Sequence, residues 1–427
     1  MNTPSRQANK HSGGWIVLYL FLMPTVLVFI PVLVEINPRE ALFYTPAVPM
    51  VFNILVIAYA VLIIRPLPKD SSLSIKSTFG LLLFVLLSII VYSTIFVAVD
   101  VLYSLTKVLD LLLFVCLAFS SAYIFQIGGA RLARNILLAI FGGVVISMPL
   151  LAVLYYFQFP DYYYWPRFLP GYVFIRIFGF SLAASIAAGT GLLTLPSLQT
   201  KIPRVSIFFG LVVLWTALFW SGSRGGIFAL ILVIPVMSIL LPNLRAGLPI
   251  AILAMVVGAI LSLNMTAPDS DFGFIQAFFT ANNYTSANAF TTGRLTEWSI
   301  VLEWISEKPL FGHGYGQTFL IGSAADVVKH AHVHNIVLEA ALSWGWVGAA
   351  CAGYLIISTW VSGVRKTMLG DMEERLPALL VISVMLVYAW VDGVYFYYQA
   401  LIPMGLCVGI ILANSRKLQA EPASPSC

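Results

Sequence analysis

The sequence predicts an all-α, polytopic membrane protein with about twelve transmembrane helices and one large outer loop that itself contains helices. Of the 427 residues, 60% are hydrophobic and 10% are charged, and the mean hydropathy is +0.94. Soluble domains carry about a quarter charged residues, far more than this chain. The apolar residues also form runs long enough to cross a bilayer, which takes about 17 to 25 residues.

The apolar runs divide the chain into two blocks of spans between short polar tails. We predict a tail at 1–14, nine helices within 15–263, an outer loop at 264–334, three helices within 335–413 and a tail at 414–427. Residues 1–14 lack an Ala-x-Ala cleavage site and read as a retained cytoplasmic tail. The predicted spans are 15–34, 46–64, 79–99, 102–124, 134–157, 172–196, 204–221, 226–242, 246–263, 335–361, 377–393 and 397–413.

Lys and Arg residues give the orientation of these spans, because they are enriched in cytoplasmic loops. Most of the 23 lie on one side when both termini are cytoplasmic. The loop 264–334 is then outside, and the basic residues left on that side need a reason to be there.

Two short outer segments are candidates for binding. The first, FPDYYYWPRFLPGY at 159–172, is an interfacial aromatic belt or a sugar-facing surface. The second is the turn SGSRGG at 221–226, where glycines allow close approach of a ligand and Ser223 and Arg224 add donors. A snorkelling arginine is the alternative for Arg224. Arg176 is predicted inside a span, where it should face a cavity or an anion instead of lipid.

The second half of the outer loop is predicted to be helical. In TGRLTEWSIVLEWISEKP, Leu295, Trp298, Leu302 and Ile305 recur at helical spacing, which indicates an amphipathic helix that ends by Pro309. Arg294 falls in the first turn, where free backbone N–H groups and a cation together can hold a phosphate.

Three of the five histidines of the chain stand within five residues, at His330, His332 and His334. Asn335 follows and an apolar helix begins, so the positive end of the helix dipole keeps a nearby imidazole neutral, which suits a general base. A solvated loop is the alternative. A metal site is another, because His330 and His334 are four residues apart, but no HExxH pattern is present and we predict no metal.

His334, Arg176, Arg224 and Arg294 are all expected at the outer membrane surface. Arginines without matching carboxylates indicate an anionic ligand, and guanidinium groups fit phosphate well. His313, in the glycine-rich turn FGHGYG, is a weaker candidate, and that turn lacks the Lys and Ser/Thr of a nucleotide-binding loop. Nucleoside triphosphates are not available outside the membrane, so a lipid-linked pyrophosphate is the natural phosphate donor.

The motifs resemble those of the bacterial O-antigen ligases. His334-Asn335, nine residues, Gly345, two residues and Gly348 is similar to the family pattern, although Ala349 and Ala350 stand where two threonines often follow. The SGSRGG turn and the run from TGRLTEW to FGHGYG are also similar to elements of the superfamily that includes O-antigen polymerases and protein O-oligosaccharyltransferases. The resemblance covers about 222–348.

The resemblance implies a GT-C-like architecture in the bacterial inner membrane, with the site facing the periplasm. It implies metal-independent, inverting transfer of an undecaprenyl-pyrophosphate-linked glycan to a sugar hydroxyl of the lipid A core, without cofactor or nucleic acid. His334 is then the base, and Arg224 and Arg294 stabilise the leaving pyrophosphate. Substrate-binding roles fall to Arg176, His332, Asn335, His313 and Ser223.

Three alternatives remain open at this stage. Within the superfamily they are an O-antigen or exopolysaccharide polymerase and a protein O-oligosaccharyltransferase. Outside it, a transporter or flippase would also have many spans and intramembrane arginine. Transport predicts charges near the bilayer midplane and internal repeats, whereas the polar residues here gather on one outer face.

Overall fold

A computed structural model gives the fold of residues 13–33, 38–63, 77–158, 169–172, 175–198, 204–266, 293–324, 332–370 and 372–413, together with Gly273, Ile275 and Thr291. These residues form a helical protein. Its α-helices are α1 (Gly14–Leu33), α2 (Pro38–Ile63), α3 (Ser77–Tyr92), α4 (Val101–Val153), α5 (Ile175–Leu192), α6 (Arg204–Ser221), α7 (Arg224–Leu240), α8 (Leu248–Ser262), α11 (Arg294–Glu307), α12 (Thr318–Ala324), α13 (Ile336–Met368), α14 (Arg375–Ala389) and α15 (Tyr398–Leu412).

Six helical segments of the described part are long and apolar enough to cross a membrane, and five shorter apolar helices accompany them. The six are Thr78–Val97, Val101–Tyr156, Ile175–Leu192, Arg204–Ser221, Pro242–Ser262 and Ile336–Met368. The prediction of a polytopic, all-helical membrane protein is therefore confirmed, while the number of about twelve passes stays a prediction.

The described residues form eleven apolar helical segments, whereas twelve spans were predicted. One long segment accounts for the difference. Val101–Tyr156 has 56 residues, or about 80 Å of helix, against a hydrocarbon core of about 30 Å. Gly129, with φ 69° and ψ −170°, interrupts α4 between the predicted spans 102–124 and 134–157. A glycine tolerates this backbone geometry, so α4 can serve as two passes joined without a loop.

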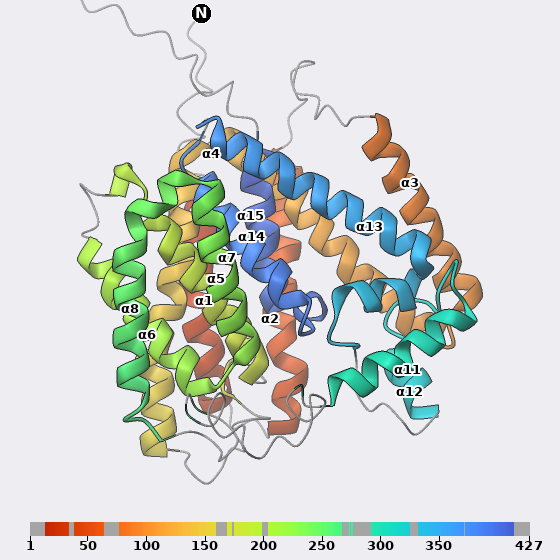
Figure 1. Cartoon of the computed structure of the whole chain (residues 1–427), viewed down its shortest axis with the longest axis horizontal. Coiled ribbons are helices and arrows are strands. Elements are labelled where there is room, and N and C mark those ends of the chain that lie inside the picture. Colours follow the sequence, from red (N-terminus) through yellow and green to blue (C-terminus); the bar gives the residue numbers. More distant parts are fainter. Residues whose placement is uncertain are drawn as a thin grey trace, which may run out of the picture.

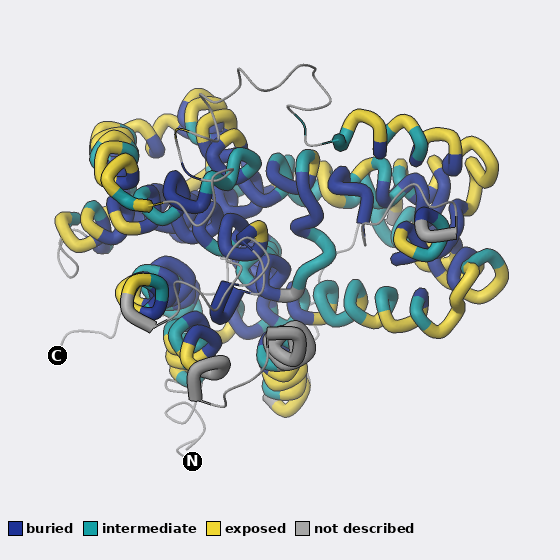
Figure 2. The backbone as a smooth tube through the Cα atoms, turned by 90° about the horizontal axis from the view of Figure 1, so that it is seen from below, coloured by how far each residue is buried: buried dark blue, intermediate teal, exposed yellow. Residues whose placement is uncertain are grey.

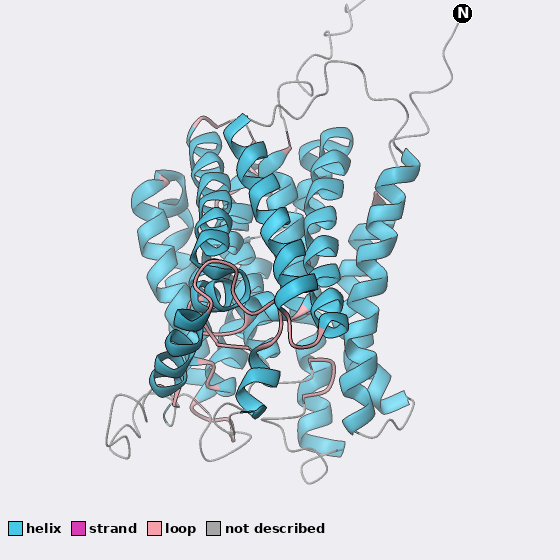
Figure 3. Ribbon diagram, turned by 90° about the vertical axis from the view of Figure 1, so that its right-hand side faces the viewer, coloured by secondary structure: helices cyan, strands magenta, loops and turns pink. Residues whose placement is uncertain are grey.

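The helices run side by side (Figures 1 and 3). Large hydrophobic residues fill the centre, and others are exposed. Helix α5 is buried along most of its length and packs against α4, α6 and α14, while α1 and α15 lie along α4. Helices α3, α7 and α8 carry exposed leucines, valines and isoleucines, as expected for a surface in contact with lipid. Exposed residues lie along the outer helices in Figure 2. Helix α13 crosses the other helices obliquely (Figure 1).

The second half of the predicted outer loop contains two helices, as the sequence indicates. Helix α11 spans Arg294–Glu307, close to the predicted limits, and α12 follows at Thr318–Ala324. Both lie at the lower end of the bundle in Figure 1, beside the start of α13. Much of 159–172, most of 264–292 and the two polar tails lie outside the described residues.

The turn that follows α11 is fixed to a break in α13. The break is at Gly345, which has φ 67° inside the helix, and a Cβ there would lie 2.2 Å from the backbone carbon of Leu310. The amide of Trp346 donates to the carbonyl of Pro309 at 2.8 Å, and the amide of His313 donates to the carbonyl of Leu342 at 2.7 Å. Gly345 is therefore a structural position, where two backbone segments meet without room for a side chain.

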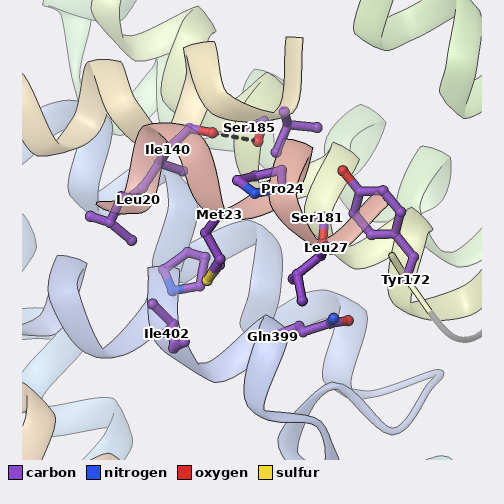
Figure 4. A pocket seen from close by; sticks show the side chains of 12 residues that line it. Leu20, Met23, Pro24, Leu27, Ile140, Tyr172, Ser181, Ser185, Gln399 and Ile402 are labelled. Atoms are coloured by element: carbon purple, nitrogen blue, oxygen red, sulfur yellow. Dashed lines mark hydrogen bonds between the residues drawn. The ribbon is translucent and has the colours of Figure 1, made fainter. Parts of the chain in front are cut away.

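A separate, mostly apolar pocket lies among α1, α4, α5 and α15 (Figure 4). Leu27 and Ile402 contribute to its wall, and Ser181, Ser185 and Gln399 are among the few polar side chains. Ser185 Oγ donates to the carbonyl of Ile140 at 3.0 Å, and Gln399 Nε2 donates to that of Gly171 at 3.0 Å. Gln399 Oε1 is buried without a hydrogen-bond partner among the described residues.

Candidate functional site

The candidate site is centred on His334, in the short segment that leads into α13. Asn335 caps this helix, with its Oδ1 accepting from the amides of Val337 at 2.9 Å and Leu338 at 3.1 Å. His334 has φ 57°, and within the described part of the chain it is the non-glycine residue with a left-handed backbone. Such a conformation costs about 1–3 kcal/mol and persists where the surroundings hold it, often at functional sites.

His334 stands between a carboxylate and a guanidinium. Its Nδ1 lies 3.0 Å from Asp392 Oδ1, and its Nε2 lies 3.2 Å from Arg176 Nη1. Because a guanidinium only donates, Nε2 must be the acceptor, and the Nδ1–H then donates to Asp392. The contacts thus fix one neutral tautomer of a buried imidazole.

The electrostatics agree with a neutral histidine beside an ionised aspartate. Burial lowers the pKa of His334 to about 4, even though the hydrogen bond to Asp392 favours the imidazolium. Burial alone would raise the pKa of Asp392, but the hydrogen bond from His334 and the charges of Arg176 and Arg294 bring it well below its ordinary value. At neutral pH the site therefore contains an imidazole and a carboxylate.

Arg294 reaches the same carboxylate from α11. Its Nη1 donates to the carbonyl of Val391, and its Nη2 lies 3.4 Å from Asp392 Oδ2. One turn further along α11, Trp298 Nε1 donates to the carbonyl of Val333 at 3.1 Å. Helix α11 is thereby attached both to the segment before α13 and to the link between α14 and α15.

His332 lies against His334, with ring centroids 4.2 Å apart. The amide of His334 donates to His332 Nδ1 at 3.4 Å, so the other ring nitrogen carries the proton and can donate to the Tyr397 hydroxyl at 3.3 Å. The rings of Tyr395 and Phe396 complete the surroundings of His332. These contacts support His332 as a residue that positions His334.

Asp392 is the site residue that sequence reasoning missed. The interpretation that the arginines lack matching carboxylates is wrong, because Asp392 contacts both His334 and Arg294. The sequence offered one signal, an acidic residue in the short link between two apolar spans. Without the fold, nothing indicated that a residue 58 positions after His334 would lie against it.

The SGSRGG turn lies against α14 near this site. Ser223 Oγ is 2.6 Å from the hydroxyl of Tyr388, one turn before Asp392, and Arg224 is the first residue of α7. A Cβ at Gly225 would lie 2.6 Å from the Tyr388 ring, so the turn needs glycine for close packing. The hydroxyl of Ser223 is thus engaged by the protein, while Arg224 is partly exposed.

Arg176 and His313 were both predicted to contact substrate, and they have different surroundings. Helix α5 begins at Ile175, and Arg176 is exposed in its first turn. His313 is buried beneath α11, where its Nε2–H donates to the carbonyl of Trp304 at 2.8 Å. His313 therefore connects α11 to the turn that follows it. His330 lies outside the described residues.

Donor atoms of His332, His334 and Asp392 all lie within 4.8 Å of one another, as a metal site requires. Three protein ligands are the usual number for a catalytic zinc. However, Arg176 and Arg294 lie within hydrogen-bonding or ion-pair distance of His334 and Asp392, and their positive charges oppose a second cation. The arrangement fits an anion better, and the absence of metal stays a prediction.

Fold and site together define a polytopic membrane protein with a buried His–Asp pair flanked by arginines at one end of its helices. A family model described as O-Antigen ligase matches residues 209–353. The resemblance seen in the motifs is thus confirmed over residues 209–353, a segment that is similar to an O-antigen ligase domain. The matched region includes Arg224, Arg294 and His334, but neither Arg176 nor Asp392.

A relative in Acinetobacter baylyi, a general O-oligosaccharyltransferase, is 28% identical over 129 residues. The alignment covers 29% of this chain and 22% of the relative. The chain therefore matches about a fifth of the relative's length, and the similarity concerns a shared segment and not the whole protein.

Proposed function

We propose that this protein is an O-antigen ligase. It transfers a glycan from undecaprenyl pyrophosphate to a sugar hydroxyl of the lipid A core, at the periplasmic face of the bacterial inner membrane. The observation that carries the proposal is the line Asp392–His334–Arg176, which aligns a base, the group that orients it and a phosphate-binding cation. The O-antigen ligase match over residues 209–353 supports the choice of reaction.

His334 acts as the base through Nε2. Asp392 holds the proton of Nδ1 and stabilises the imidazolium that forms, so the lone pair of Nε2 faces the acceptor. In the free protein Nε2 accepts a hydrogen bond from Arg176. A donor phosphate competes for that guanidinium, because charge-assisted bonds to phosphate are stronger than a bond to a neutral imidazole. Binding of the donor thus frees the base.

The transfer step is a single displacement. The acceptor oxygen gives its proton to His334 Nε2 and bonds to the anomeric carbon, while the bond from that carbon to the pyrophosphate breaks. The electron pair leaves on the pyrophosphate, and the configuration at carbon inverts. Cations positioned where this charge develops lower the barrier, a role we assign to Arg224 and Arg294 together with Arg176.

Asp392 orients Arg294. The Arg294 guanidinium contacts Asp392 and the carbonyl of Val391, so the direction of this side chain is fixed before substrate binds. A preorganised cation loses less entropy on binding than a mobile one. Asn335 instead serves the fold, because its side-chain amide donates to the carbonyl of Trp390 at 3.2 Å while its oxygen caps α13.

A deletion strain with the gene restored as wild type, His334→Ala or Lys308→Ala tests the proposal, with lipopolysaccharide examined on a gel. We expect His334→Ala to leave a complete core without its polymer ladder, at normal membrane levels of the protein. Lys308→Ala, at the exposed end of α11, should behave as wild type. A normal ladder with His334→Ala would contradict the base assignment. A chelator should leave transfer by the purified protein unchanged, and loss of activity would favour a metal site.

Protein O-oligosaccharyl transfer is the second candidate, favoured by the similarity to the relative in Acinetobacter baylyi. The same experiment separates the candidates by their products. Unchanged lipopolysaccharide with loss of glycosylated protein would indicate the oligosaccharyltransferase. A core carrying one repeat unit would indicate an O-antigen polymerase. Loss of none of these products would indicate exopolysaccharide polymerisation or transport.

A further inference from the structure

Glu297 is a buried acid that the proposed reaction does not yet use. The residue is 7% exposed, and its Oε1 is buried without a hydrogen-bond partner among the described residues. Buried polar oxygens are normally paired in folded proteins, so an unpaired one at a functional site indicates a missing ligand or water. The exposed Glu303 of the same helix shows no such burial.

The position of Glu297 connects it to the site. It follows Arg294 by three residues on α11, so both side chains project from one face of the helix. The next residue, Trp298, is hydrogen-bonded to Val333, which lies between His332 and His334. The helical turn of α11 that carries Glu297 is therefore attached to the segment 332–335, which contains His334.

The charges around Glu297 come from four elements. Arg294 of its own helix and Arg176 of α5 favour the carboxylate, while Glu339 of α13 and Asp392 between α14 and α15 oppose it. Burial is the largest influence and raises the pKa of Glu297 to about 7. Both protonation states are thus accessible near neutral pH, which is unusual for a glutamate.

An anionic donor makes one of these states unfavourable. The pyrophosphate placed on Arg294 and Arg176 brings negative charge close to Glu297, and an ionised carboxylate in a buried site would repel it. An uncharged carboxyl has no such effect and offers both a donor and an acceptor for hydrogen bonds. Glu297 stands three residues after Arg294, about 4.5 Å along the helix. The sugar of a donor whose pyrophosphate is bound at Arg294 would therefore be within reach of Glu297.

We propose that Glu297 binds the donor in its uncharged form, with its free oxygen accepting a hydrogen bond from a hydroxyl of the sugar next to the pyrophosphate. The proposal rests on the proposed function, because it assigns the donor to Arg294 and Arg176. Glu297 is then a substrate-contacting residue that selects a neutral, hydroxyl-bearing sugar at this position.

Binding of the donor without acceptor tests the proposal, because no chemical step then enters the measurement. The probe is a synthetic polyprenyl-pyrophosphate-linked N-acetylhexosamine, titrated against the purified full chain between pH 6 and pH 9. Both of its phosphates are strongly acidic diesters and stay ionised throughout. We expect the Kd of the wild type to be constant below about pH 7 and to rise by up to about tenfold per pH unit above it, as the carboxyl ionises.

Glu297→Gln cannot ionise but keeps a donor and an acceptor, so it should bind the probe tightly with a Kd that is constant across the range. Glu303→Gln, on the exposed side of α11, should keep the wild-type profile. A flat wild-type profile would overturn the proposal, as would a Glu297→Gln protein that retains the pH dependence. Weak binding by Glu297→Gln at every pH would also overturn it, because the charge would then be required.

Measuring both donor binding and glycan transfer separates failure of the proposed ligase function from failure of the role of Glu297. If the wild type neither binds the probe nor transfers glycan, the proposed function itself fails. If the wild type binds and transfers while Glu297→Gln behaves as Glu303→Gln does, only the role of Glu297 is removed.

Discussion

Two positions near the start of α13 have a left-handed backbone but carry different residue types. They are His334, just before the helix, and Gly345, within it. His334 has φ 57° and carries a side chain that contacts Asp392 and Arg176. Gly345, eleven positions later, has φ 67° and receives the backbone of the turn after α11. Glycine adopts this conformation at little cost, whereas histidine is strained there.

The difference shows what each position is required to supply. At Gly345 the protein needs space, so the residue without a side chain solves the problem. At His334 it needs a side chain in a direction that an unstrained backbone does not give, and the contacts with Asp392, Arg176 and His332 hold the strain in place. The motif from His334 to Gly348 thus combines a catalytic residue, His334, with a residue required for packing, Gly345. Substitutions should separate the two, through activity at the first region and through stability at the second.

Asp392→Asn should give the largest effect, confined to the chemistry. An asparagine fits the same space but cannot stabilise an imidazolium at His334 Nδ1 by charge. It also weakens the attachment of Arg294. We expect kcat for glycan transfer to fall by about 10²–10⁴-fold, as when an orienting carboxylate is neutralised beside a catalytic histidine.

The measurement is single-turnover transfer by purified protein, together with its melting temperature. Glu307→Gln, at the exposed end of α11, is the control for loss of a carboxylate and should stay within about twofold of wild type. A transfer rate near wild type for Asp392→Asn would remove the aspartate from the mechanism.

Gly345→Ala should reverse the pattern, with stability affected first. The new Cβ would lie 2.2 Å from the Leu310 carbonyl carbon, on a backbone with φ 67°. Strain and overpacking each cost about 1–3 kcal/mol, so we expect a loss of about 3 kcal/mol and a lower yield of folded protein. Activity per folded molecule should fall less than in Asp392→Asn.

Gly353→Ala is the matched control for that substitution. This glycine lies in the same helix, and a Cβ added to it would meet no other atom within 4 Å. Alanine is the better helix former by about 1 kcal/mol, so the variant should be as stable as wild type or more so. Equal melting temperatures for Gly345→Ala and Gly353→Ala would contradict the account of the break in α13.

Local sequence features gave most of the architecture. Long apolar runs predicted the helical spans, and helical spacing in TGRLTEWSIVLEW predicted α11 almost to its limits. The start of α13 directly after Asn335 also agrees with the predicted beginning of an apolar helix. The continuity of α4 through Gly129 was not predictable in this way, because composition around Gly128 and Gly129 resembles a loop.

Long-range contacts explain what the sequence did not reveal about the site. His334, Arg176 and Arg294 were identified because histidine and arginine are costly near a membrane and so draw attention. Asp392 was missed because its partner His334 lies far along the chain, and Glu297 because its burial is visible only in the fold. The same limit applies to His313, which looked like a site residue from its glycine-rich turn but is hydrogen-bonded to Trp304.

His313→Gln should have the smallest effect on transfer and stability. It tests whether His313 belongs to the catalytic site or only to the fold. Burial lowers the pKa of His313, so the side chain is neutral and serves as a donor to the Trp304 carbonyl. Glutamine keeps an N–H at a similar reach, so transfer should stay within about twofold of wild type. His313→Leu would leave that carbonyl unpaired, at about 1–3 kcal/mol of stability. The two variants are compared by melting temperature and transfer rate. A hundredfold loss of transfer in His313→Gln at unchanged stability would show that His313 takes part in the reaction.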